Sequence, residues 1–193
     1  MWKPLLVLIA LVSCSLGTRV ADAASFEARD FSALAIEADQ IVIGTVATTS
    51  ARRTGPREIV TDYRFDKLEV VKGKVTTSSL TLTMLGGSVG TDKLTVVGAP
   101  TFKRGVRYLV FISGNGTMMF PLVGGDQGIF QIRGDQLSGV PRIHDYKGRA
   151  VTRLPARAVL SESLLHDEGP GEPMSQTAFV DAIRAKIIER SVP

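Results

Sequence analysis

This chain consists largely of strand-like segments that follow one another almost directly, and this limits the folds it can adopt. Each segment ends in a turn that contains glycine or another turn former. Runs rich in Val, Ile and Thr, or alternating in polarity, are typical of β-strands. Such runs are predicted at residues 41–49, 59–70, 80–84, 106–112, 118–123, 129–133 and 140–146. They follow one another without intervening helices, which excludes a parallel sheet built from βαβ units. The sequence therefore predicts a mostly β protein with antiparallel strands.

The second of these segments carries a shift in its alternation. Tyr63 and Phe65 share one parity of the strand period. Leu68 and Val70 share the other parity. Because a one-residue insertion moves every later side chain to the opposite face, the shift predicts a β-bulge near residues 66–67.

The segment at residues 106–112 is a continuous apolar run, which is typical of a strand buried on both faces. Asn115-Gly116 is a hairpin turn signal, so residues 118–123 are predicted to return antiparallel to that strand. The polar stretch at residues 52–56 is expected to be a loop.

Helical patterns are confined to the two ends of the mature chain. Residues 30–38 predict a short helix, and residues 175–190 predict a C-terminal amphipathic helix capped by Ser175. The apolar stripe of the second helix, expected to pack on the sheet, consists of Phe179, Val180, Ile183, Ile187 and Ile188.

The first residues predict export. Lys3 precedes an apolar run at residues 5–12, and the tripeptide Ala21-Asp22-Ala23 follows. A run this short does not cross ~30 Å of hydrocarbon as a permanent helix, which needs roughly 20 apolar residues. Residues 1–23 are therefore predicted to be a signal peptide, so the mature protein is periplasmic or extracellular and has no transmembrane span.

Cys14 leaves an alternative open for the same segment. Residues 11–14 (Leu-Val-Ser-Cys) also resemble the lipobox of bacterial lipoproteins, in which the Cys is lipidated and becomes the first mature residue. In that case the protein is a lipid-anchored envelope component.

Cleavage after Ala23 removes two cationic residues and one acidic residue, so the formal charge falls from +4 to +3. No cysteine then remains, and packing alone must stabilise the domain. We expect a β-barrel domain at residues 24–155, a linker at 156–174 and the packed helix at 175–190.

One short motif invites an enzymatic interpretation. Gly86-x-Ser88-x-Gly90 matches the nucleophile elbow of α/β-hydrolases, with His144 or His166 as base and Asp126 to orient it. The elbow requires a helix after the serine, whereas the residues that follow are β-rich and end in Gly and Pro. We therefore predict no catalytic residues.

Metal, cofactor and nucleic-acid sites are not predicted either. The two histidines are 22 positions apart and neither has a second ligand at helical or hairpin spacing. No cluster of Lys and Arg with interleaved aromatic residues is present, which argues against nucleic-acid binding.

Three motifs in a fixed order resemble a known family. They are Ala38-Asp39 before a hydrophobic run, a strand at residues 63–71 that runs into Lys72-Gly73, and Gly105-x-x-Tyr108-Leu109. This pattern resembles the netrin-like module of tissue inhibitors of metalloproteinases, and exported bacterial proteins of uncharacterised role, over about residues 31–133. The resemblance implies an OB-like five-stranded antiparallel barrel, here with an extra hairpin and the C-terminal helix. Those inhibitors chelate the protease zinc through an N-terminal cysteine that this chain lacks after cleavage.

Together these features predict an exported, non-enzymatic binding module. OB-type barrels bind ligands on a strand face and the adjoining loops. The expected partner is an extracytoplasmic protein, either a protease or an envelope component. The candidate contacts form a basic, glycine-rich rim, which consists of Arg52, Arg53, Arg57, Gly86, Gly87 and Ser88.

Overall fold

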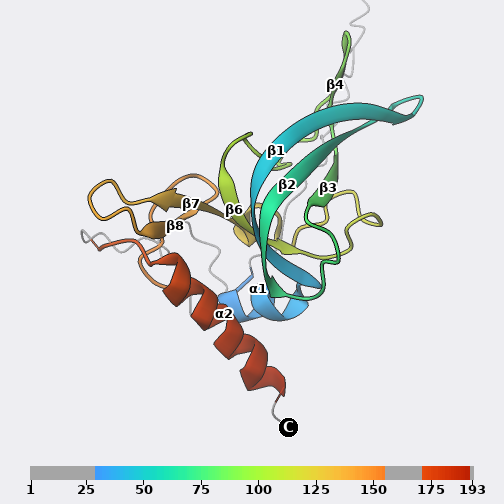
Figure 1. Ribbon diagram of the computed structural model, residues 1–193. Coiled ribbons are helices and arrows are strands. Elements are labelled where there is room, and N and C mark those ends of the chain that lie inside the picture. Colours follow the sequence, from blue (N-terminus) through green and yellow to red (C-terminus); the bar gives the residue numbers. More distant parts are fainter. Residues whose placement is uncertain (1–28, 155–170, 192–193) are drawn as a thin grey trace, which may run out of the picture.

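The computed structural model describes residues 29–154 and 171–191, which form a mostly β fold (Figure 1). The predicted signal peptide, Cys14, His166 and most of the predicted linker lie outside the described residues. The elements are α1 (Phe31–Glu37), β1 (Gln40–Gly55), β2 (Glu58–Lys72), β3 (Leu80–Leu85), β4 (Gly87–Val89), β5 (Asp92–Leu94), β6 (Arg107–Ile112), the 3-10 helix η1 (Gly125–Gly128), β7 (Ile129–Gly134), β8 (Pro141–Asp145) and α2 (Gln176–Ser191).

A single antiparallel sheet in the order β3-β2-β1-β6-β7-β8 organises the domain, and β4 and β5 form a separate hairpin. The sheet is open, with β3 and β8 at its edges. Within the described ranges no strand joins these two edges, so the five-stranded OB-like barrel stays a prediction.

Each face of the sheet carries its own hydrophobic core. Ile43 and Leu109 pack with residues of α1 and α2 on what we call the helix face. Val42 and Val110, their neighbours in β1 and β6, pack on the opposite face around Phe102, which we call the Phe102 face. Strand β6 is thus buried on both sides, as its continuous apolar run predicts.

The predicted β-bulge is confirmed. Ile43 and Thr45 of β1 pair with Glu69 and Asp66 of β2, so β2 carries one extra residue between the paired positions. Lys67, inside this bulge, has a φ of 54°. The irregularity increases the local twist and lets the long β1–β2 pair curve, as Figure 1 shows.

A loop at residues 95–104, which we call the Phe102 loop, closes the Phe102 face. The Phe102 ring makes edge-to-face contacts with Tyr63, Phe65 and Tyr108 at centroid distances of 5.1, 5.3 and 5.1 Å. The backbone N–H of Lys103 donates to the Tyr108 hydroxyl at 3.0 Å. On the other side of Phe102, the N–H of Thr101 donates to the hydroxyl of Tyr146 at 2.8 Å. Two tyrosine hydroxyls therefore fix the loop on either side of the buried ring.

The short helix α1 is tied to the end of β2. Asp30 caps its N-terminus by accepting from the N–H of Ala33 at 2.6 Å. At the other end the Lys72 ammonium donates to the carbonyl oxygens of Ala35 and Ile36 at 2.9 and 2.8 Å. These two carbonyls are among those a helix leaves unsatisfied, so Lys72 stabilises the C-terminus of α1.

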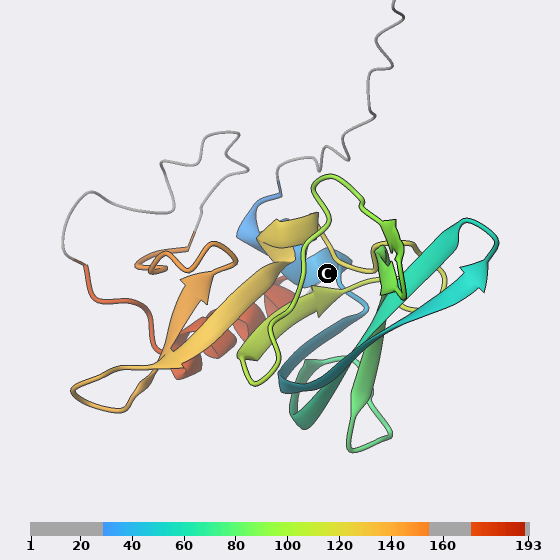
Figure 2. The same ribbon diagram turned by 90° about the horizontal axis from the view of Figure 1, so that it is seen from above.

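The C-terminal helix packs on the sheet as predicted, with one exception. Ser175 caps it, because its hydroxyl accepts from the N–H of Ala178 at 3.2 Å. Phe179 and Ile183 are fully buried on the helix face. Ile188, predicted to be part of the same stripe, is 63% exposed, since the last turns of α2 extend past the sheet (Figure 1). Seen from above, α2 lies behind β7 and β8 (Figure 2).

Two local predictions are wrong. Residues 52–55 are not a loop, because β1 continues to Gly55, and the turn is confined to Pro56 and Arg57. Polar residues suit a strand here because β1 is largely exposed from residue 48 onward.

Residues 118–123 do not form a strand. The N–H groups of Thr117 and Met118 both donate to the carbonyl of Gly114, which curls the chain into a turn. Only the end of the segment runs beside β6, where the N–H of Val123 donates to Phe111 at 3.0 Å. The loop instead contacts β3 through a hydrogen bond between the Leu85 N–H and the carbonyl of Met119 at 3.0 Å.

The described end of the predicted linker, residues 171–174, lies along β8. The N–H of Ile143 donates to Met174 at 2.9 Å, and the N–H of Met174 donates to Val151 at 2.8 Å. This backbone pairing covers part of the outer edge of β8 just before α2 begins.

Candidate functional site

The structure brings the two segments of the predicted rim together at one end of the molecule. We call the outer part of the β1–β2 hairpin, residues 47–64, the arm; it reaches away from the helices (Figure 1). The β4–β5 hairpin packs on the arm. The N–H of Gly86 donates to the carbonyl of Ile59 at 2.8 Å, and the Thr61 hydroxyl donates to the carbonyl of Gly86 at 2.6 Å. The rim is thus one continuous surface built from both hairpins.

Gly87 makes this close approach possible. A Cβ atom at this position would lie 2.4 Å from the Thr61 hydroxyl oxygen and 3.1 Å from the Cβ of Ala51. The backbone of Gly87 also has a φ of 138°, which side-chain-bearing residues rarely adopt. Glycine at position 87 therefore has a packing role that keeps β4 against the arm.

Replacement of Gly87 by Ala is expected to detach β4 from the arm at a cost of about 1–3 kcal/mol. Hydrogen exchange of the Gly86 N–H and the thermal midpoint should both report the change. Gly90→Ala is the matched control, because Gly90 also has a positive φ of 60°, but a Cβ atom there would meet no other atom within 4 Å. Equal effects of the two substitutions would contradict the packing role of Gly87.

Arg52 is held by an acidic partner on β2. Its Nε donates to the Asp62 carboxylate at 2.7 Å, and the Thr83 hydroxyl donates to the same carboxylate at 2.6 Å. Burial acts to raise the pKa of Asp62, but the hydrogen bonds from Arg52 and Thr83 and the charge of Arg52 outweigh it and lower that pKa. The positive charge of Arg52 is therefore largely compensated within the arm.

The lowered pKa of Asp62 makes stability depend on pH. Because the folded-state pKa lies below the unfolded value, this stabilisation is fully present at neutral pH and is lost as the pH falls below about 4 through the folded-state pKa. Asp62→Asn should lower the free energy of unfolding at pH 7 by about 1 kcal/mol and flatten its decline in acid. Chemical unfolding at several pH values measures both effects. Asp66→Asn, in an exposed pair with Arg64, is the control, and an unchanged acid profile in Asp62→Asn would refute the assignment.

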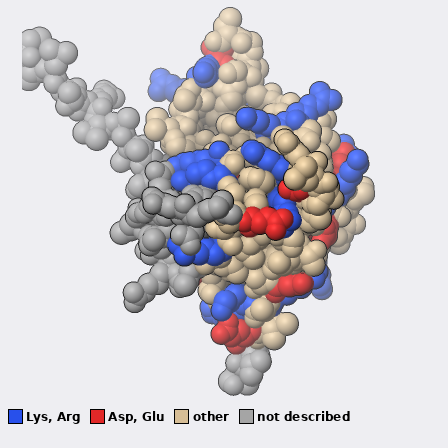
Figure 3. Space-filling model, turned by 90° about the vertical axis from the view of Figure 1, so that its left-hand side faces the viewer, with Lys and Arg blue, Asp and Glu red and all other residues tan. Residues whose placement is uncertain are grey.

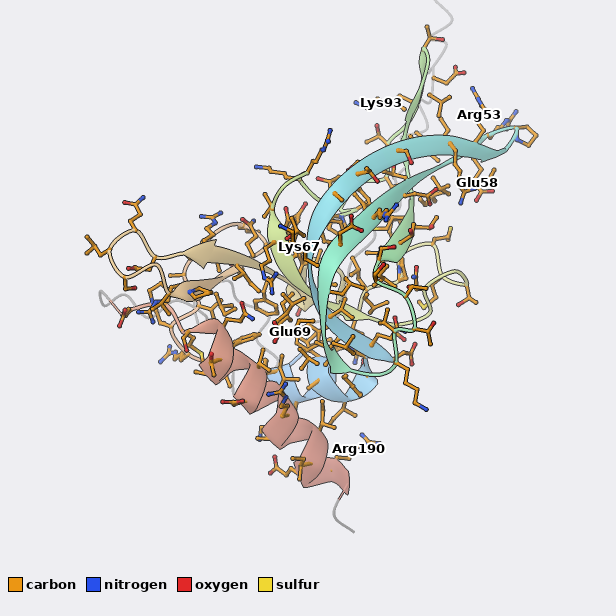
Figure 4. All side chains as sticks on the ribbon, in the orientation of Figure 1. Arg53, Glu58, Lys67, Glu69, Lys93 and Arg190 are labelled. Atoms are coloured by element: carbon orange, nitrogen blue, oxygen red, sulfur yellow. The ribbon has the colours of Figure 1, made fainter. Side chains whose placement is uncertain are left out.

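The other rim cations differ in how they are compensated. Arg53 forms an ion pair with Asp92 of β5 and lies 3.5 Å from the carbonyl of Pro56. Arg57 is exposed and has no ionic partner among the described residues. Lys93, which was not among the predicted rim residues, is also exposed and without an ionic partner in the same ranges. Figure 4 shows Arg53 and Lys93 on the two hairpins at the end of the arm. The rim is consequently less basic than its sequence indicates, with its free cations at the tip.

Ser88 does not occupy a nucleophile elbow. It lies on β4, which is followed by a turn and by β5 rather than by a helix. Strand β4 contacts β1, β2 and β5, whereas His144 belongs to β8 at the opposite edge of the sheet, and Asp126 belongs to η1. The structure therefore does not bring Ser88, His144 and Asp126 together.

His144 is the histidine that the structure describes. Burial and the charge of Arg133 lower its pKa. Within residues 29–154 and 171–191, no three or more His, Cys, Asp or Glu side chains are grouped so that they could hold a metal ion. The same residues include no helix long and apolar enough to cross a membrane.

No family model, curated protein or solved structure matches this chain. The arm and the rim themselves therefore have to carry any inference about function.

Proposed function

We propose that this chain is an exported, non-enzymatic binding module that contacts an extracytoplasmic protein through the arm and the rim. The partner class is a protease or another protein of the envelope. The observation that carries the proposal is the convergence of two hairpins, distant in sequence, into one exposed surface at the end of the arm.

The arm has features of a contact surface rather than of a structural one. Tyr63 is the arm residue that belongs to a hydrophobic core, and the strand β1 is largely exposed from residue 48 onward. Ion pairs of Arg52 and Arg53 hold the arm in place, while Arg57 and Lys93 leave free positive charge at its end. Charged groups on a projecting rim steer association and set specificity.

We also infer that the open sheet is a variant of an OB-like barrel, in keeping with the resemblance to netrin-like modules. The loop after β6 is hydrogen-bonded to the edge strand β3 through Asn115, whose side chain donates to the carbonyl of Thr81 at 2.8 Å. The Leu85 bond to Met119 adds a second link. These contacts connect β6 and β3 around the Phe102 face, where a barrel would close.

Crosslinking capture tests the binding proposal. The purified mature domain is incubated with envelope and secreted fractions of the host, and captured proteins are identified by mass spectrometry. A double variant, Arg57→Ser with Lys93→Ser, should capture severalfold less of the specific partners. The control is Arg184→Ser with Lys186→Ser on the outer face of α2, which should capture as much as the wild type. Equal capture by the two variants would overturn the role of the rim.

The export prediction has its own test, the intact mass of the mature protein purified from its host. A protein that begins after Ala23 or Ala24 is the expected product. A mature protein that begins at an acylated Cys14 would instead establish the lipid-anchored alternative.

A further inference from the structure

Among residues 29–154 and 171–191, the outer edge of β1 in the arm is a free strand edge. Strand β6 pairs with β1 only from Gln40 to Thr45. Just beyond, a turn at residues 103–106 closes against Val46, since the Gly105 N–H donates to the Val46 carbonyl at 2.8 Å. Over residues 48–53, β1 pairs with β2 and with no other strand in the described part of the chain. An unpaired row of backbone N–H and C=O groups is a template for adding a strand.

The ladder shows which backbone groups point outward. In antiparallel pairs, successive residues direct their N–H and C=O groups to alternate sides. Leu85 of β3 is the partner of Val60 in β2, and the N–H of Leu85 points away from β2, to Met119. The N–H and C=O groups of Val60 therefore point to the other side, toward β1, where its partner is Arg52. The groups on either side of Arg52, those of Ala51 and Arg53, therefore face the free edge, as do those of Thr49.

This edge lacks the usual devices that prevent strand addition. Register shifts lie between Val46 and Thr48 and between Arg53 and Gly55, while the pairing from Thr48 to Arg53 is regular. Natural edges are commonly blunted by Lys, Pro or a bulge within the edge. Residues 48–53 contain neither Lys nor Pro, and the two arginines among them are engaged with Asp62 and Asp92.

Charge around the edge indicates what it would accept. Lys103 and Arg104 lie at the inner end, in the turn that abuts Val46, and both are exposed without an ionic partner in the described part of the chain. Arg57 and Lys93 lie at the outer end and are likewise exposed, with no ionic partner among the described residues. Figure 3, which views the left-hand side of Figure 1, shows more Lys and Arg than Asp and Glu side chains in its upper half. A strand with acidic side chains would meet complementary charge at both ends of the edge.

We propose that residues 48–53 of β1 bind an extended acidic segment of a partner protein by strand addition, an inference that rests on the proposed function and gives its binding mode. Main-chain hydrogen bonds to Thr49, Ala51 and Arg53 supply the affinity, and the cations at the two ends select acidic sequences. A second copy of the chain is disfavoured as the occupant, because it would bring the same uncompensated cations to the edge. One strand pair also buries less surface than a stable dimer requires.

The probe for this proposal is a synthetic peptide of alternating Thr and Glu, compared with its counterpart of alternating Thr and Lys. Fluorescence anisotropy of the labelled peptides measures binding to the mature domain. The Glu peptide should bind and the Lys peptide should not. Ala51→Pro removes an N–H that faces the free edge without removing a bond to β2, and it should weaken binding at least about tenfold.

A second measurement does not depend on the folding of a variant. A Glu peptide N-methylated at every residue has no backbone N–H to donate on either edge, so its binding to the wild-type domain should also fall at least about tenfold. Unchanged affinity of the N-methylated peptide, or of Ala51→Pro, would overturn strand addition. Failure of the Glu peptide to bind at all would also overturn strand addition. The proposed function would survive that result if partner capture still depended on Arg57 and Lys93. Self-association abolished by Ala51→Pro would assign the edge to a second copy and overturn the acidic partner.

Discussion

Replacing Phe102 by Ala is expected to lower the free energy of unfolding by about 3–5 kcal/mol. The ring is 5% exposed and contacts three other aromatic rings, so its removal leaves a cavity between the Phe102 loop and the sheet. Edge-to-face contacts of this kind add stabilisation beyond the area they bury. Because domains of this size are stable by only about 5–15 kcal/mol, the loss is a large part of the total. Equilibrium unfolding in denaturant measures it.

Val97 supplies the control for that substitution within the same loop. Its side chain is 58% exposed, so Val97→Ala should change the free energy of unfolding by less than about 0.5 kcal/mol. A loss below about 1 kcal/mol in Phe102→Ala would show that the loop does not close the Phe102 face as described.

Phe179→Ala should have an effect of similar size on the helix face. Phe179 is fully buried, and its ring lies 5.2 Å from that of Phe31 and 4.8 Å from that of Phe130. The substitution removes a side chain that contacts both α1 and the sheet, at an expected cost of about 3–5 kcal/mol. Denaturant unfolding gives the global loss, and hydrogen exchange within α2 shows whether the helix is released first.

Ile188, on the same helix, is the matched control for Phe179. Ile188→Ala removes a side chain that is 63% exposed and should leave stability within about 0.5 kcal/mol of the wild type. If both substitutions had the same small effect, α2 would not be packed on the sheet in solution.

The local sequence pattern predicted the strands that are buried on one or both faces. The apolar run of β6 indicated a strand buried on both sides, and the change in parity within β2 indicated the bulge that contains Lys67. Both signals arise because burial imposes period and polarity on consecutive residues. Where burial is weak, as in the outer part of β1, the same reasoning mistook exposed strand residues for a loop.

The features that sequence reasoning missed depend on residues far apart in the chain. Phe102 is a single aromatic residue in an irregular loop, so no periodicity marks it as the centre of a core. The compensation of Arg53 by Asp92 arises only because the β4–β5 hairpin folds back onto the arm. The sequence placed Arg53 and Gly87 in one candidate surface, but their mutual contacts through the two hairpins required the fold.

The exposed β1 strand of the arm contributes little to the hydrophobic cores that stabilise the domain. The outer part of the arm extends beyond both hydrophobic cores. The arm is fixed by β3, which pairs with β2 at residues 60–65, by the β4–β5 hairpin, by the ion pairs of Arg52 and Arg53, and by the bond from Thr61 to Gly86. A two-stranded hairpin alone is marginally stable in water, so these contacts keep the free edge of β1 in an extended, ordered form. Such preorganisation lowers the entropic cost of binding a partner.

Site-specific photocrosslinking tests the central claim, that the arm is where this protein binds, most directly. A photoreactive residue at Thr49 lies on the free edge of β1, and one at Ile188 lies on the exposed end of α2. Exposed to the envelope and secreted fractions of the host, the Thr49 probe should crosslink a protein partner through an acidic segment identified by mass spectrometry. The Ile188 probe should not crosslink that partner. Crosslinks from Ile188 with none from Thr49 would contradict the account and place the binding surface on the helices.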